Sequence, residues 1–257
     1  MKRPKSRILL IRRKYVVAVA LALAVMAIFY IVNHPALVGV AARERALPIY
    51  SVQRDDQTLS LTFNAADVAD IHTRRVVEIL NAHNVRATFF VTGDWVRQNE
   101  DLARSLAESG HELQNLSNDH GLLRKMTAAE IRENLEACNA VIAAITGEPP
   151  TIFRAPYGAY DDNLVALARS LGLHTVQWSI DSGDWRGGSA ETIARQVRTR
   201  AFPGGIVLLH SNLEQTVQAL PEIIGTLQIA GYTLIPVSEL VIQTAFTITM
   251  TGRQIPV

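Results

Sequence analysis

The sequence predicts an α/β protein built as a distorted (β/α) barrel. Short runs of β-branched and apolar residues alternate with longer segments of helical character. Repeated βα units require parallel strands joined by right-handed crossovers, for which an open doubly wound sheet and a closed barrel are the two main solutions. No glycine-rich dinucleotide fingerprint follows the first run, and polar residues follow several of the later runs. Both observations favour the barrel.

The individual elements follow from local patterns. The strands are predicted at 59–63, 87–91, 152–153, 175–179, 206–210 and 233–237. Between them, Thr127 and Glu130 have the spacing of a capping box at the start of a helix. Gly172 and Gly231 lie where helices should end. The chemistry of a β/α barrel collects at the C-terminal ends of its strands. The polar residues expected at that end are Asn64, Arg154, Asp181, Asp184 and His210.

The N-terminal region predicts a membrane anchor. Residues 1–14 contain seven basic side chains, and no charge occurs from 15 to 32. An apolar run of about 18 residues is just long enough to cross a bilayer, and the basic cluster favours a cytoplasmic N-terminus. We expect a single-pass anchor over 15–33 in the cell membrane, with an extracytoplasmic domain. A cleaved signal peptide is the alternative, with processing near the small residues Val40, Ala41 and Ala42.

Composition bounds the rest of the chain. Proline residues and weak periodicity predict a linker at 34–57, followed by a folded domain at 58–241 and a C-terminal tail at 242–257. Apart from the seven N-terminal basic residues, 18 basic residues stand against 24 acidic ones. This negative balance argues against nucleic acid as a partner. The single Cys138 excludes an intramolecular disulfide.

Three short motifs place polar and aromatic side chains after predicted strands. They read Arg154-Ala155-Pro156-Tyr157-Gly158, Ile180-Asp181-Ser182-Gly183-Asp184-Trp185 and Leu208-Leu209-His210. Alone, the first is equally well explained as an ordinary turn beside a surface arginine. A single histidine after an apolar strand is more often structural. The combination of a carboxylate, an indole and a histidine at strand ends favours a functional site instead.

These motifs resemble those of the polysaccharide deacetylase family, whose catalytic unit is the NodB homology domain. The resemblance covers 58–241, and the preceding Leu47-Pro48-Ile49-Tyr50-Ser51-Val52 is similar to the membrane-anchored, sporulation-associated branch of Gram-positive bacteria. It implies hydrolysis of N-acetyl groups on cell-wall glycan, with N-acetylglucosamine or N-acetylmuramic acid residues of peptidoglycan as substrate. The implied cofactor is a divalent metal such as zinc.

The resemblance also implies roles for individual residues. His210 takes the position of the general acid, Asp184 tunes its protonation, and Arg154 orients the catalytic carboxylate. The positions implied to bind substrate are Pro156, Tyr157, Trp185 and Leu209.

Two further motifs depart from the family pattern. Thr62-Phe63-Asn64-Ala65-Ala66 stands where relatives have Thr-Phe-Asp-Asp-Gly, whose first Asp is the general base and whose second binds metal. In the motif that supplies two metal-binding histidines, Leu116 replaces the first, and only His120 is retained. A zinc ion needs about three protein ligands besides water. Asn64 cannot accept a proton at neutral pH.

Three functions remain open. The first is a deacetylase with a modified or relocated metal site. The second is a catalytically inactive barrel that binds glycan or serves as a scaffold at the membrane surface. The third is a metal-free hydrolase that uses Asp181 and Asp184 as an acid/base pair. Side chains near the lost ligands that could join His120 around a relocated metal are Asp67, Asp70, His72, His111 and Asp119.

Overall fold

The structure is a computed structural model that describes residues 13–33, 46–67, 69 and 71–257. The chain divides into two compact units, Met1–Arg45 and Ala46–Val257. The first contains helix α1 (Arg13–Asn33), which coincides with the predicted membrane span at 15–33. Within the described residues, no helix combines the length and the apolar character needed to cross a membrane. Residues 1–12 of the predicted basic segment and 34–45 of the predicted linker lie outside the described residues.

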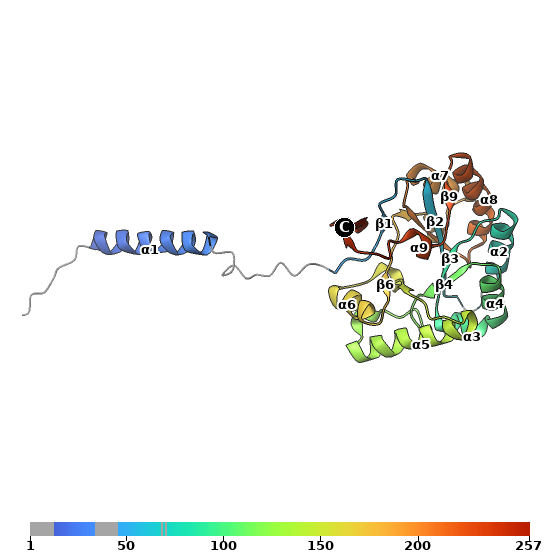
Figure 1. Cartoon of the computed structure of the whole chain (residues 1–257), viewed down its shortest axis with the longest axis horizontal. Helices are drawn as coiled ribbons and strands as arrows, with labels where there is room; N and C mark the ends of the chain where they lie inside the picture. Colours follow the sequence, from blue (N-terminus) through green and yellow to red (C-terminus); the bar gives the residue numbers. More distant parts are fainter. Residues whose placement is uncertain (1–12, 34–45, 68, 70) are drawn as a thin grey trace, which may run out of the picture. The chain divides into compact units, whose positions relative to one another are not determined.

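A curled parallel sheet forms the centre of the second unit (Figure 1). Its strands follow the order β6-β5-β4-β3-β2-β8-β7, and β9 pairs with the N-terminal end of β2. Every pairing in this sheet is parallel, as expected for βα units. The bounds are β2 Thr58–Ala65, β3 Thr88–Val91, β4 Glu112–Asn115, β5 Ile152–Phe153, β6 His174–Thr175, β7 Ile180–Asp181, β8 Ile206–His210 and β9 Thr233–Leu234.

This sheet confirms the predicted distorted barrel in the form of a curled half-barrel. The predicted strands omit β4 and β7, for reasons visible in their composition. Strand β4 reads Glu-Leu-Gln-Asn, with a single apolar residue, and β7 is only two residues long. Neither has the apolar or alternating pattern from which a strand is predicted.

Helices pack around the sheet (Figure 1). The capping box is confirmed at the start of α5, where the Glu130 carboxylate accepts a hydrogen bond of 2.7 Å from the Thr127 backbone. The glycine ends are also confirmed, because Gly172 and Gly231 adopt φ of 77° and 86° just after α6 and α8. The bounds are α2 Thr73–Ala82, α3 Gly93–Gln98, α4 Glu100–Glu108, α5 Ala128–Thr146, α6 Asp162–Ser170, α7 Ala190–Arg200, α8 Glu214–Ile229 and α9 Val237–Leu240.

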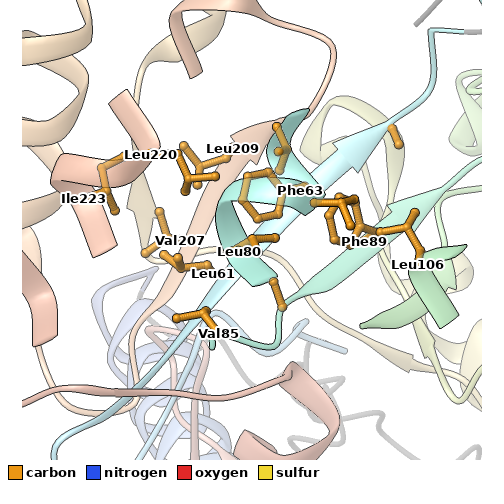
Figure 2. Close-up of a cluster of buried hydrophobic side chains, with 14 of the residues drawn as sticks. Leu61, Phe63, Leu80, Val85, Phe89, Leu106, Val207, Leu209, Leu220 and Ile223 are labelled. Atoms are coloured by element: carbon orange, nitrogen blue, oxygen red, sulfur yellow. The ribbon is translucent and has the colours of Figure 1, made fainter. Parts of the chain in front are cut away.

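The main core lies between the sheet and its helices. Figure 2 shows Leu61 and Phe63 of β2 beside Val207 and Leu209 of β8, with Leu220 from α8 packed against them. Alternate residues of a strand point to opposite faces. The intervening positions of β2, occupied by serine, threonine and asparagine, therefore face the inside of the curl.

Segments predicted as linker and tail are part of the folded unit. The second sheet, of order β1-β11-β10, joins β1 (Ser51–Val52) to β11 (Arg253–Pro256) and β10 (Phe246–Ile248). Just before β1, the backbone N–H of Ile49 donates to the Thr175 carbonyl at 2.9 Å. The N–H of Val52 donates to Gly204, whose φ of 80° and close approach to Val52 leave no room for a Cβ. The segment 49–52 thus connects β6 to the residues just before β8, and the folded unit extends past both predicted boundaries.

Candidate active site

Strand register brings the polar residues together at one end of the sheet. Asn64 is in register with His210 of β8. Arg154 follows β5, and its backbone N–H donates to the carbonyl of Asn115 at the end of β4, at 2.8 Å. Asp181 lies beside Leu208 in the pairing of β7 with β8. These C-terminal strand ends form the mouth of the half-barrel, where chemistry is expected in this architecture.

A fully buried carboxylate fixes the histidine at this mouth. Asp184 starts a 3₁₀ turn (Asp184–Arg186) and accepts hydrogen bonds from the ring Nδ1 of His210 at 2.9 Å and from its backbone N–H at 2.7 Å. It also accepts from the Trp185 backbone and from the Thr216 hydroxyl, each at 2.8 Å. With Nδ1 held in this way, Nε2 is the nitrogen that His210 can offer to a ligand.

Arg154 is a buried cation held by neutral groups. Its guanidinium donates to Oδ1 of Asn64 at 3.0 Å and to the Gln177 carbonyl at 3.1 Å, and it lies 3.8 Å from the ring centre of Phe90. Complete burial lowers the pKa of Arg154 well below its ordinary value. An arginine side chain is nevertheless protonated in proteins. Position 64 therefore presents a neutral amide to a buried positive charge.

Two aromatic side chains are exposed at the mouth. Tyr157 is 66% exposed, adopts φ of 58°, and places its ring centre 4.6 Å from that of His120. Trp185 is 56% exposed, and its indole N–H donates to Asp181 at 3.3 Å. Pro156, predicted to bind substrate, is buried in the turn that presents Tyr157. Exposed rings of this kind provide flat apolar faces for a ligand.

The prediction that Leu209 contacts substrate is wrong. Its side chain is completely buried in the main core, on the helix-facing side of β8 (Figure 2). The reason is the two-residue period of a strand, which turns Leu209 outward when His210 points into the mouth.

The residues present do not fit a zinc ion. Ala65 is fully buried in the core between sheet and helices, whereas Leu116 is fully buried in a separate apolar cluster that also contains Phe90. His120 is held by a backbone hydrogen bond of 2.9 Å to the Ser117 hydroxyl. Burial, and then the proximity of His210, lower the pKa of its imidazole. Within the described part of the chain, no cluster of three or more His, Cys, Asp or Glu side chains could hold a metal.

The side chains considered for a relocated metal site have other partners. His72 lies 3.2 Å from Glu214, and Asp119 accepts from Gly121 and Asn134, both at 3.0 Å. Asp67 accepts a bond of 3.1 Å from the Ala69 backbone. Asp70 lies outside the described residues.

His111 lies at the opposite end of the sheet, immediately before β4. Its ring accepts a hydrogen bond of 3.3 Å from the Ala87 backbone and makes an edge contact with Phe89. Burial lowers the pKa of this imidazole to about 4. His111 is therefore a packed, neutral core residue.

Sequence reasoning missed two groups that organise the mouth. The Thr216 hydroxyl completes the hydrogen bonds around Asp184 from the first turn of α8. The backbone carbonyl of Gln177 holds Arg154. Neither belongs to a recognisable motif, and a carbonyl leaves no signal in residue type, so both required the fold to be seen.

The fold and mouth define a NodB-type (β/α) half-barrel with a carboxylate and histidine pair at its C-terminal edge. A family model described as polysaccharide deacetylase matches residues 51–176. The chitooligosaccharide deacetylase of Bradyrhizobium is 31% identical over 215 residues, which cover 76% of this chain and 98% of that protein. The chain belongs to the polysaccharide deacetylase family.

Other relatives differ in length and in activity. The peptidoglycan-N-acetylglucosamine deacetylase PgdA of Listeria monocytogenes is 33% identical over 73% of this chain, which spans 39% of PgdA. The chain also spans 61% of the length of an uncharacterized relative from Bacillus subtilis. Among solved structures, BA3943 of Bacillus anthracis, a CE4 family pseudoenzyme, aligns with TM-score 0.71 and 32% identity, over 75% of this chain and 68% of BA3943. A mutant of BA3943 with restored enzymatic activity aligns with TM-score 0.72.

The buried imidazole of His111 predicts a specific pH dependence of stability. Its folded pKa of about 4 lies below the ordinary value of 6.5, so the unfolded chain takes up a proton first as pH falls. The contribution of His111 to the free energy of unfolding is fully present above pH 6.5. It decreases by about 3 kcal/mol as pH falls to 4. Replacement His111→Asn keeps an acceptor for Ala87 and should flatten the stability profile over that range, measured by urea unfolding at pH 7.5 and 4.5.

His174→Asn is the matched control, because this imidazole is only half-buried and its pKa is lowered less by desolvation. An unchanged pH slope in His111→Asn would contradict the assignment of His111 as a buried neutral residue.

Proposed function

We propose that this barrel binds acetylated cell-wall glycan and that its deacetylase activity is lost or very weak. The hydrogen bond of 3.0 Å between Arg154 and Asn64 carries the proposal. It supports the interpretation that an amide occupies the position of the general base, held by the arginine to which the family resemblance assigns the orientation of that base. Residues that act as one catalytic unit fail together when one is removed.

The retained features support binding. Of the two exposed rings, Tyr157 contacts His120, and Trp185 is hydrogen-bonded through its backbone to Asp184, which also holds His210. Sugar rings stack on aromatic faces and hydrogen-bond to nearby polar groups. Relatives named for peptidoglycan or chitooligosaccharide substrates support a glycan as the ligand.

A weak metal-dependent deacetylase is the second candidate. The observation in its favour is the contact of 2.9 Å between His210 and Asp184, which provides an oriented imidazole suited to proton transfer. The metal content of the purified chain separates the two candidates. About one equivalent of zinc retained after dialysis against a weak chelator would favour the enzyme.

The metal-free hydrolase is disfavoured by its own carboxylates. Asp184 is completely buried and accepts four hydrogen bonds, so it is closed to substrate. Asp181 is used by the backbone of Gly183 and by the indole of Trp185.

Replacement of Trp185 tests the glycan site. Because the indole is one of the two exposed aromatic side chains at the mouth, Trp185→Ala should weaken binding of an N-acetylglucosamine tetramer by about tenfold or more. Calorimetry on the purified full-length chain measures the affinity. Trp185→Phe keeps a ring and loses only the bond to Asp181, so it should bind nearly as well as the parent. Equal binding by the Ala variant would place the glycan elsewhere.

Restoring the missing groups tests the loss of metal. The combined variant Asn64→Asp, Ala65→Asp, Leu116→His should bind about one zinc, because it supplies two oxygen or nitrogen ligands beside His120. The single variant Asn64→Asp is the control and should bind none. Plasma mass spectrometry after dialysis gives the metal content, and a triple variant without zinc would show that the strand ends cannot form the ligand geometry.

We also propose that the domain lies outside the cytoplasm, attached through the N-terminal region. The supporting features are the basic cluster of residues 1–14, the uncharged run at 15–32 and the wall-directed relatives. Protease added to intact spheroplasts should digest the C-terminal domain while a cytoplasmic marker survives. Protection of the domain until the cells are lysed would place it inside.

A further inference from the structure

We propose that the floor of this mouth recognises a carboxylate group carried by a sugar, in place of the water and acetamide handled by active relatives. The inference rests on the proposed glycan-binding function and deepens it by naming the group that is read. By the floor we mean Asn64 and Arg154. The inference follows from the hydrogen bond between them, which decides which hydrogen-bond donors and which charge are present there.

The Arg154 contact decides which way the Asn64 amide faces. A guanidinium only donates hydrogen bonds, so it requires the carbonyl oxygen of Asn64, and the bond of 3.0 Å to Oδ1 satisfies this requirement. The amide nitrogen of Asn64 must then point away from Arg154. Among the described residues no acceptor holds this nitrogen, and it is not closed off from solvent. Where an aspartate would present an acceptor to the mouth, Asn64 presents N–H donors.

His120 carries a second unpaired polar atom, close to Tyr157. Its Nε2 is buried and has no hydrogen-bond partner among the described residues. The centres of the His120 and Tyr157 rings lie 4.6 Å apart.

The charge of the floor favours an anion over a neutral acceptor. Arg154 is completely buried, its Nε has no partner, and its two contacts are to an amide oxygen and a backbone carbonyl. A buried charge that lacks a counter-ion is costly, and a nearby carboxylate reduces that cost without touching the guanidinium. A neutral acetamide oxygen offers the same hydrogen bonds and no such compensation.

The carboxylates already near the mouth do not serve as this counter-ion. Asp184 directs its two oxygens at His210, Trp185 and Thr216. Asp119 is used by the backbone of Gly121 and the side chain of Asn134. Asp181 is held by Gly183, Trp185 and Arg186. Within the described part of the chain, Arg154 therefore has no carboxylate as a hydrogen-bond partner.

A sugar is the carrier because the carboxylate would lie between exposed rings. Tyr157 contacts His120, and Trp185 is hydrogen-bonded through its backbone to Asp184, the partner of His210. Two sugar types bring a carboxylate close to a pyranose ring, namely muramic acid through its lactyl ether and a uronic acid through its own C6. Both share the chemistry that the floor recognises.

The experiment compares each acid with its own methyl ester. N-acetylmuramic acid, glucuronic acid and their methyl esters are titrated into the full-length chain, and the Trp fluorescence is recorded. Each ester keeps the ring and the oxygens and removes only the charge. We expect the acid to bind at least tenfold more tightly than its ester for one of the two sugars, which identifies the source of the carboxylate.

Asn64→Asp is the decisive variant. It is nearly isosteric, supplies Arg154 with a counter-ion, and replaces the donors by an acceptor, so the preference for the acid should disappear. Its thermal unfolding should show a fold at least as stable as the parent. Equal binding of acid and ester by the parent chain, or an acid preference that survives in Asn64→Asp, would overturn the inference.

A titration with acetate separates this inference from the proposed function. The side-chain amide signal of Asn64 in the ¹⁵N-labelled chain should shift with acetate in the parent. Acetate binding without binding of any sugar would support the carboxylate site and overturn the glycan function. Sugar binding without a preference for the acid and without an acetate shift would support the glycan function and overturn the carboxylate site.

Discussion

The buried guanidinium of Arg154 is the constraint on which the mouth of this barrel depends. It follows β5, is covered by the ring of Phe90, and makes its hydrogen bonds only to neutral oxygens. A carboxylate at position 64 would form a charge-assisted bond about twice as strong as a neutral one. With asparagine there, the protein retains the geometry of the base position but not its charge. Because Arg154 bonds to the carbonyl oxygen of Asn64, the amide nitrogen is held pointing away from the guanidinium.

The two positions to which the family resemblance assigns metal ligands, Ala65 and Leu116, lie in apolar packing. Leu116 continues the cluster inside the curl, and Ala65 belongs to the core on the helix side of the sheet. Burial of a leucine side chain is worth about 1.5–3 kcal/mol. These replacements therefore stabilise the fold at the place where ligands would impose a cost of desolvation. A return to metal binding would require polar atoms in positions that the present packing fills with carbon.

The sequence predicts the architecture better than it predicts the site. Alternating strand and helix patterns, the capping box before α5 and the glycine ends of α6 and α8 follow from local physics, and the structure confirms them. Strands as short as β7 carry too little pattern to be found. The burial of Leu209 could have been predicted from its neighbour His210, since adjacent strand residues face opposite ways. The orientation of the Asn64 amide could not, because it depends on a contact between residues 90 positions apart.

The presence of the pair Asp184 and His210 is weak evidence for catalysis, because Asp184 also has a structural role. Two of the four hydrogen bonds that Asp184 accepts come from backbone N–H groups, those of His210 and Trp185, and a third comes from Thr216 in α8. The carboxylate thereby ties the end of β8 to the turn that carries the indole and to the following helix. Leaving those buried donors unsatisfied would cost about 1–3 kcal/mol each, whether or not the protein turns over a substrate. Position 64 is under no such structural requirement, because asparagine satisfies Arg154 nearly as well in shape. Asparagine at position 64 beside an intact histidine pair is therefore consistent with the proposal that the mouth is kept for binding.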